Sequence, residues 1–193
     1  MELALQQKLV ARLCTDRAFR EEFFAAPAQV AAHEGLTVAA EGLASLHPEQ
    51  LRQFARLLRT RRLGEAGEAL PLTRRALGFR FADLFKAFAI QGLPPGEHMG
   101  EDAVAFVNFL EQQAVTQPLE PAWVRSLARY EATRVEAEWL GRRKLVVRQF
   151  PHALRRLLPA FAAGGVPEGD FSGWTLAVWC CASSGQRPRH WLW

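Results

Sequence analysis

The most constraining feature of this sequence is a helical spacing of apolar residues that continues through about its first two-thirds. Apolar side chains recur three or four positions apart, as at Leu9, Val10 and Leu13, and polar residues such as Lys8 and Arg12 stand between them. A helix with this spacing has one apolar face, and that face must be buried against another element. The sequence therefore predicts one amphipathic helix after another.

Caps and helix breakers divide this region. Thr15 or Asp16 is expected to cap a helix whose Phe19, Phe23 and Phe24 face inward. Further helices are expected from Pro27 to Gly35, over 37–45, from Pro48, from Pro71 with apolar residues through Phe88, over 101–115 and over 121–140. The helix that begins at Pro48 has a weak end at Gly64 and Gly67. Its apolar positions are Leu51, Phe54, Ala55, Leu57 and Leu58. Residues 92–100 contain Pro94-Pro95-Gly96 and are predicted to form a loop.

The last 50 residues or so change to a β pattern. Residues 144–150 are expected to form a strand that Pro151 ends, and 152–163 a helix that Gly164-Gly165 ends. Residues 174–182 alternate between two faces, with Trp174 on one and Trp179 on the other. Residues 187–193 then form a hairpin partner. We predict a mainly α fold, with a multi-helix domain over 1–141 and a small lobe over 142–193 that contains a short antiparallel sheet.

Composition excludes several classes of protein. The chain has 193 residues, 49% of them apolar, and three cysteines, which do not suffice for a disulfide scaffold. The longest uncharged stretch, 171–186, has 16 residues and is too short for a membrane helix. Glu2 stands where a signal peptide would need basic residues. We therefore expect a cytoplasmic protein without a membrane span.

Sequence signatures of enzymes are missing. The chain has no glycine-rich phosphate loop and no HExxH, GxSxG or CxxC motif, and its five histidines are scattered. Cys180, Cys181 and His190 would converge in a terminal hairpin, but a zinc site would need a further ligand that the sequence does not identify. We predict no catalytic residue, no metal ligand and no cofactor, and hence a protein that is not an enzyme.

Arginines account for most of the positive charge. The net charge is +4, and 21 of the 24 basic residues are Arg. Clusters occur at Arg52, Arg56 and Arg59, at Arg125 and Arg129, and at Arg142, Arg143, Lys144 and Arg148. Such faces neutralise nucleic-acid phosphates. Solvated, salt-bridged helices or a coding sequence rich in Arg codons would also explain these faces, so DNA binding is kept as an alternative interpretation.

The carboxyl-terminal hairpin is unusually aromatic. A β element this small cannot easily bury Trp179, Trp191 and Trp193 together, and a terminal strand is often an edge strand. An edge with aromatic and Arg side chains suits docking of a protein or of an extended peptide by strand addition. The candidate contact residues are Trp179, Arg187, Arg189, Trp191 and Trp193. The alternative, that the tryptophans pack on the helical lobe, remains open.

Segments along most of the chain resemble one protein family. They are Leu13-Cys14-Thr15-Asp16 with Arg20, Phe23, Pro27 and Gly35-Leu36; Phe54-Ala55-Arg56 with Leu58 and Arg61-Arg62; Leu70-Pro71-Leu72-Thr73 with Leu77-Gly78, Phe81, Leu84-Phe85 and Phe88-Ala89; and Val147-Arg148, Phe150, Trp179 and Arg189-His190. With these segments the chain resembles the accessory partner proteins of multinuclear non-haem iron-dependent oxidative enzymes in ribosomal peptide maturation, of the methanobactin-biosynthesis type.

The resemblance implies a non-catalytic protein that works in a hetero-oligomer, such as a heterodimer. Its partner would be the iron-dependent oxidative enzyme, which carries the metal and modifies a ribosomally made precursor peptide. The accessory protein would dock on that enzyme and help recognise the leader part of the precursor. Relatives have also been labelled DNA-binding proteins, which keeps a DNA-binding regulator as the alternative function.

Overall fold

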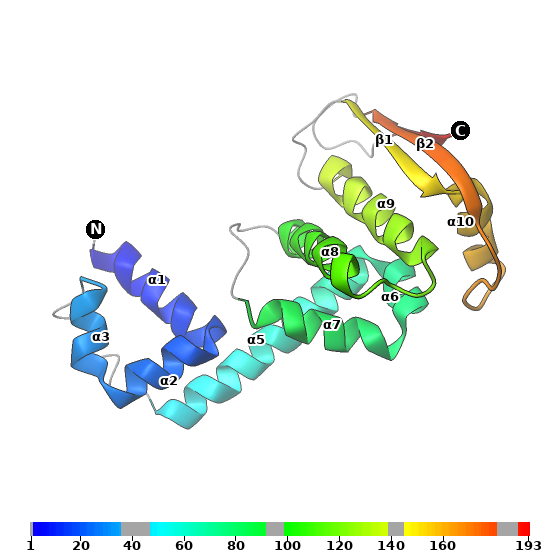
Figure 1. Cartoon of the computed structure of the whole chain (residues 1–193). Helices are drawn as coiled ribbons and strands as arrows, with labels where there is room; N and C mark the ends of the chain where they lie inside the picture. The colour runs from blue at the N-terminus through cyan, green and yellow to red at the C-terminus, as the bar shows by residue number, and fades with distance from the viewer. Residues whose placement is uncertain (1, 36–46, 92–98, 139–144, 181–188) are drawn as a thin grey trace. The chain divides into compact units, whose positions relative to one another are not determined.

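The structure is a computed structural model that describes residues 2–35, 47–91, 99–138, 145–180 and 189–193. It confirms a mainly helical chain with a small antiparallel sheet near the carboxyl terminus (Figure 1). The chain divides into two compact units, one made of Met1–Arg62 and Lys86–Leu93 and the other of Leu63–Phe85 and Pro94–Trp193. The division predicted after residue 141 is therefore not where the structure divides, because the sheet packs on a preceding helix of its own unit.

Among its described residues, the first unit includes three short helices and the start of a longer one. They are α1 (Glu2–Thr15), α2 (Arg17–Ala25), α3 (Pro27–His33) and the beginning of α5 (Pro48–Ala69). Their apolar faces form one cluster of buried side chains: Leu9, Leu13, Cys14, Phe19, Phe23, Val30, Ala31 and Leu51. The predicted inward positions of Phe19 and Phe23 are confirmed. The helix expected over 37–45 lies outside the described residues.

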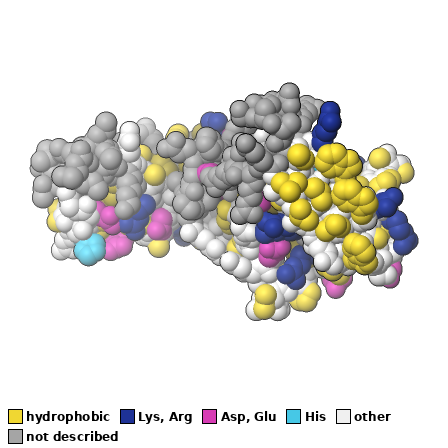
Figure 2. Space-filling view, turned by 90° about the horizontal axis from the view of Figure 1, so that it is seen from above, with side chains coloured by type: hydrophobic (Ala, Val, Ile, Leu, Met, Phe, Trp, Pro, Cys, Tyr) yellow, Lys and Arg dark blue, Asp and Glu magenta, His cyan; other side chains and the backbone are white. Residues whose placement is uncertain are grey.

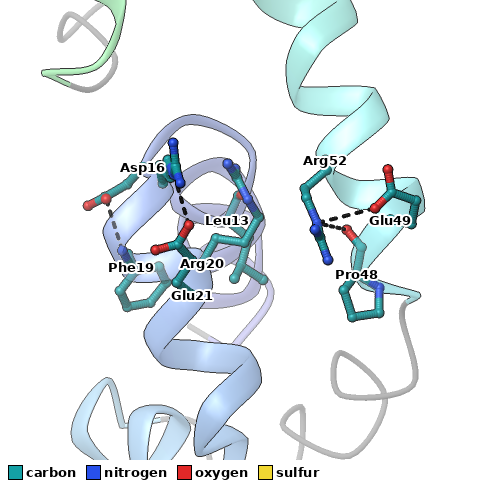
Figure 3. A network of polar contacts seen from close by, with 9 residues as sticks. Leu13, Asp16, Phe19, Arg20, Glu21, Pro48, Glu49 and Arg52 are labelled. Atoms are coloured by element: carbon teal, nitrogen blue, oxygen red, sulfur yellow. Dashed lines mark hydrogen bonds and ion pairs between the residues drawn. The ribbon is translucent and has the colours of Figure 1, made fainter.

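Polar contacts fix the ends of these helices. The Asp16 side chain accepts a hydrogen bond from the Phe19 amide at 3.0 Å, as expected for the cap of α2 (Figure 3). Arg20 donates from Nη1 to the Leu13 carbonyl at 2.7 Å, which satisfies an oxygen in the last turn of α1 (Figure 3). Arg12 forms an ion pair with Glu34 and covers the Phe19 ring. These contacts hold α1, α2 and α3 together.

Helix α5 departs from the predicted pattern in two ways. It continues through Gly64 and Gly67 to Ala69, and a Cβ at Gly67 would lie 2.9 Å from Cδ of Arg74. Glycine at this position therefore allows the Arg74 side chain to approach the helix closely. In addition, Phe54 and Leu57 are exposed, although their spacing suggested inward positions.

In the second unit, helices pack beside one another. They are α6 (Pro71–Leu77), α7 (Phe79–Ala89, of which residues up to Phe85 belong to this unit), α8 (Met99–Thr116) and α9 (Trp123–Glu138). The single helix expected after Pro71 is interrupted at Gly78, whose φ of 55° favours glycine. Phe81 and Phe85 each contact the ring of Phe106 edge to face, with centroids 5.3 and 5.1 Å apart.

Two neighbouring charges on α9 hold the junction between α5 and α6. The buried Glu131 carboxylate accepts hydrogen bonds from the amides of Leu72 and Thr73 at 2.9 and 2.7 Å. Arg134 donates to the carbonyl of Ala69 at 2.9 Å. The carboxylate thus meets a helix amino terminus and the guanidinium meets a helix carboxyl terminus, as the helix dipoles require. Burial raises the pKa of Glu131, and the amide hydrogen bonds and the charge of Arg134 oppose this effect.

The sheet has the strand order β1-β2-β3 and lies along α9 (Figure 1). The strands are β1 (Leu145–His152), β2 (Ser172–Cys180) and β3 (Arg189–Leu192), and α10 (Leu154–Ala162) connects the first two. Both strand pairs are antiparallel. Arg75 of α6 donates to the carbonyls of Phe161 and Gly165 at 2.8 and 2.6 Å, which fixes the end of α10. The predicted hairpin is confirmed, with its turn outside the described residues.

None of the helices in the described segments is both long enough and apolar enough to cross a membrane.

Candidate interaction surfaces

The two faces of the sheet differ in what covers them. Residues of β2 alternate, so that Thr175, Ala177 and Trp179 are buried while Trp174 is 64% exposed. In β1, Val146 and Phe150 are buried and Leu145 and Val147 are exposed. The inner face packs on α9, and the opposite, outer face meets solvent.

The outer face is an apolar surface. Register places Val147 opposite Val178 and Val178 opposite Trp191. Trp191 and Trp193 are 44% and 52% exposed. The apolar residues of this outer face are Leu145, Val147, Trp174, Leu176, Val178, Trp191 and Trp193. The register places Gln149, Cys180 and Arg189 on the same face. Figure 2 shows hydrophobic side chains gathered over the strands, with basic side chains near the margin. A continuous apolar patch on a folded protein is typical of a binding surface.

Trp179 is a correction to the predicted contact residues. It is 1% exposed, so its ring is part of the core and does not lie on the surface. The physical reason is its position on the inner face, where its ring lies 5.5 Å from Tyr130 of α9 and is stacked on His190. The Tyr130 hydroxyl and Nε2 of His190 are 3.2 Å apart. Trp179 therefore fixes the sheet on α9, and burial raises the pKa of Tyr130 at this contact.

The other predicted contact residues have different positions. Trp191 and Trp193 lie on the outer face, and Arg189 is exposed beside them in β3. Arg189 is paired with Cys180 across the strands. Arg187 lies outside the described residues. The structure thus brings Arg189 and Trp191 of β3 together with Trp193, which directly follows that strand.

Of the residues considered for zinc, Cys180 and His190 do not converge, and Cys181 lies outside the described residues. Cys180 pairs with Arg189, and Trp179 pairs with His190. Successive residues of a strand face opposite ways, so Cys180 and His190 lie on opposite faces of the sheet. Over the described segments, no group of three or more His, Cys, Asp or Glu side chains is placed to hold a metal ion.

A hollow of about 610 Å³ lies between α8, α9 and β1. Among its lining residues, Oγ of Ser126 and Nδ1 of His152 are 2.7 Å apart. Burial lowers the pKa of His152, and the charge of Asp170 opposes this effect. The Asp170 carboxylate accepts hydrogen bonds from the amide and hydroxyl of Ser172, both at 2.8 Å.

This arrangement is not that of an activated serine nucleophile. Ser126 is buried near the start of α9, and Asp170, whose charge acts on His152, is engaged with Ser172. The pair ties the end of β1 to α9. Sequence reasoning missed it because 26 positions separate the two residues, and no motif spacing connects them.

Another hollow, in the first unit, is lined by arginines of α2 and α5. The predicted alignment of Arg52, Arg56 and Arg59 on one side of a helix is confirmed, because all three line it. Sequence reasoning missed Arg17 and Arg20, which stand opposite them on α2. Of the basic cluster predicted at 142–144 and Arg148, the structure describes only Arg148, because 142–144 lie outside the described segments.

Comparisons with protein-family models and with curated proteins found no match to this chain.

Proposed function

We propose that this chain is a non-catalytic accessory protein that docks on an iron-dependent oxidative enzyme and helps it to recognise a precursor peptide. The proposal combines the resemblance noted above with one observation, the apolar outer face. A three-stranded sheet in water is expected to have polar residues on its open face. Here two tryptophans, Trp191 and Trp193, stand beside the valines of β1 and β2 instead.

The chemistry of the outer face suits a protein partner. Aromatic and Arg side chains contribute most to the energy of protein interfaces, and Arg189 adjoins the tryptophans. Burying the exposed parts of Trp174, Trp191 and Trp193 would remove large apolar surfaces from water. The outer face would therefore form the centre of the contact with the enzyme, and Arg189 part of its rim.

The free edge of β3 suits the peptide. Trp193 exchanges both backbone hydrogen bonds with Leu176, at 2.9 and 3.0 Å. In antiparallel pairing, hydrogen-bonded and non-hydrogen-bonded residues alternate, so the amides of His190 and Leu192 point away from β2. Among the described strands, none pairs with β3 on that side. An extended leader segment could add there as a further strand.

Co-expression with an iron-dependent oxidative enzyme encoded beside this chain tests the docking. We expect the two proteins to co-purify and the variant Val147→Arg to abolish co-purification, because it places a charge in the middle of the outer face. Val115→Arg is the matched control, since Val115 is also an exposed valine but belongs to α8. If the proteins never co-purify, with or without precursor peptide, the proposal is wrong.

A proline variant tests the peptide site. Leu192→Pro removes an outward amide while leaving the hydrogen bonds of Trp193 to β2 in place. We expect this variant still to bind the enzyme but no longer to bind the precursor. Fluorescence anisotropy of a labelled leader peptide measures the loss of peptide binding. Unchanged peptide affinity would exclude strand addition at β3.

The alternative, a DNA-binding regulator, has less support from this geometry. Arg129 is engaged with Asn108 and Glu111, and Arg148 is half-buried on the inner side of the sheet. The arginines of α2 and α5 line a hollow. Duplex binding that weakens steeply with salt would favour this alternative, and no duplex binding at low ionic strength would exclude it.

A further inference from the structure

The hollow between α2 and α5 concentrates positive charge. Its volume is about 600 Å³, and its walls carry five guanidinium groups and one carboxylate, that of Glu21. The arginines are Arg17 and Arg20 of α2 and Arg52, Arg56 and Arg59 of α5. Phe24, Ala25 and Pro48 supply an apolar part of the wall. All of these residues belong to the first unit.

Among the described residues, few carboxylates neutralise these charges. Arg17 is paired with Glu21 at 2.8 Å, and Arg52 is 3.5 Å from Glu49 (Figure 3). Within the described part of the chain, Arg20, Arg56 and Arg59 have no carboxylate at ion-pair distance. The contacts of Arg20 and Arg59 are with backbone carbonyls, those of Leu13 and Ala55. Several guanidinium groups thus line the hollow without a counter-charge from the residues that the structure describes.

The burial of Arg20 makes this arrangement costly. Arg20 is 8% exposed, and a buried cation normally has a charged partner. Desolvation lowers the pKa of Arg20, and the positive charge of Arg59 lowers it further. An anion bound in the hollow would relieve both effects, because it would supply the missing counter-charge and stabilise the charged form.

The number of donors indicates the kind of anion. A guanidinium group forms paired hydrogen bonds to carboxylate or to phosphate. A carboxylate has only two oxygens, whereas a phosphoryl group has three that carry up to two charges and can serve several arginines at once. The volume lies in the ordinary range for sites that bind small molecules, and Phe24 and Pro48 could contact the rest of such a molecule.

We propose that the arginine-lined hollow between α2 and α5 binds the phosphoryl group of a small phosphorylated molecule. Arg20 lies at the base as the buried charge, and Arg56 and Arg59 contact the phosphoryl oxygens from α5. The site lies in a different unit from the sheet, so this inference does not depend on the docking function proposed above.

Calorimetric titration of the full chain with pyrophosphate at low ionic strength tests the site. We expect saturable binding to one site. The double variant Arg56→Gln/Arg59→Gln should weaken it by about tenfold or more, because each lost charged hydrogen bond costs at least that order. Arg155→Gln is the matched control, because Arg155 is an exposed helical arginine in the other unit. The affinity of this variant for pyrophosphate should be unchanged. Arg56 is exposed, so Arg56→Lys, which keeps the charge, should fold normally and bind with intermediate affinity.

Three results would overturn the proposal. The first is no pyrophosphate binding, or binding that the double variant leaves unchanged. The second is acetate or an acidic peptide binding as tightly as pyrophosphate, since the site would then recognise carboxylates. The third is a short DNA duplex binding far more tightly than pyrophosphate and losing that affinity in the double variant, because the hollow would then belong to a nucleic-acid surface. Preference for pyrophosphate over all of these, lost in the double variant, supports the assignment.

Discussion

Replacing Glu131 should show how strongly a single buried carboxylate on α9 stabilises the start of α6. Its two oxygens accept hydrogen bonds from the amides of Leu72 and Thr73 at 2.9 and 2.7 Å. These amides belong to the first turn of α6, where amides lack partners within the helix, and the residue at the cap position, Leu70, offers no side-chain acceptor. The variant Glu131→Ala would leave two donors without an acceptor in the core.

The magnitude follows from these two bonds. A hydrogen bond to a charged group contributes roughly 1.5–3 kcal/mol, and the variant also removes the cost of burying the carboxylate. We therefore expect a loss of about 3 kcal/mol in the free energy of unfolding, which lowers Tm by roughly 6–12 °C for a chain of this size. Glu131→Gln keeps one acceptor but turns an amide group toward the second donor, so it should lose about half as much.

Thermal and urea unfolding followed by circular dichroism measure the loss, and hydrogen exchange locates it. The amides of Leu72 and Thr73 should exchange up to roughly a hundredfold faster in Glu131→Ala, the ratio that corresponds to 3 kcal/mol. Glu68→Gln is the control, because Glu68 is exposed at the end of α5. This variant should change the free energy of unfolding by no more than about 0.5 kcal/mol. Unchanged unfolding and unchanged exchange of both amides in Glu131→Ala would refute the reasoning.

Other predictions test the core, the backbone and the response to pH. Trp179→Ala should lower the free energy of unfolding by about 3–5 kcal/mol in urea titrations, whereas Trp191→Ala on the outer face should change it by less than about 1 kcal/mol; similar losses would contradict their assigned faces. Gly78→Ala should lower the free energy of unfolding by about 1–3 kcal/mol, because a φ of 55° strains a residue that has a Cβ. Gly64→Ala within α5 should raise it by up to about 1 kcal/mol, so thermal unfolding should show Tm shifts of opposite sign for the two variants. Burial lowers the pKa of His152, so the folded state binds a proton less readily than the unfolded chain, whose histidine titrates near about 6.5. The free energy of unfolding should fall as the pH decreases from 7 through that value, and His152→Gln should reduce this loss; an identical pH profile would exclude His152 as its source.

Local sequence signals predicted most of the elements correctly. The cap at Asp16, the helix starts at Pro27, Pro48 and Pro71 and the alternation of residues in β2 are set by neighbouring residues, and the structure confirms them. The exposed positions of Phe54 and Leu57 could not be predicted in this way. Apolar spacing identifies a face of a helix, but it does not show whether a neighbouring element covers all of that face.

The candidate sites show the same limit. The sequence by itself determined that Trp174 and Trp179 lie on opposite faces of one strand, because successive side chains of a strand alternate. Only the tertiary structure decided that α9 covers the Trp179 face, which makes Trp179 a core residue and leaves Trp191 and Trp193 exposed. It also joined Ser126 to His152 and set the arginines of α2 opposite those of α5. Such contacts depend on how elements pack across long separations in the chain, and the spacing of residues within one element carries no information about that packing.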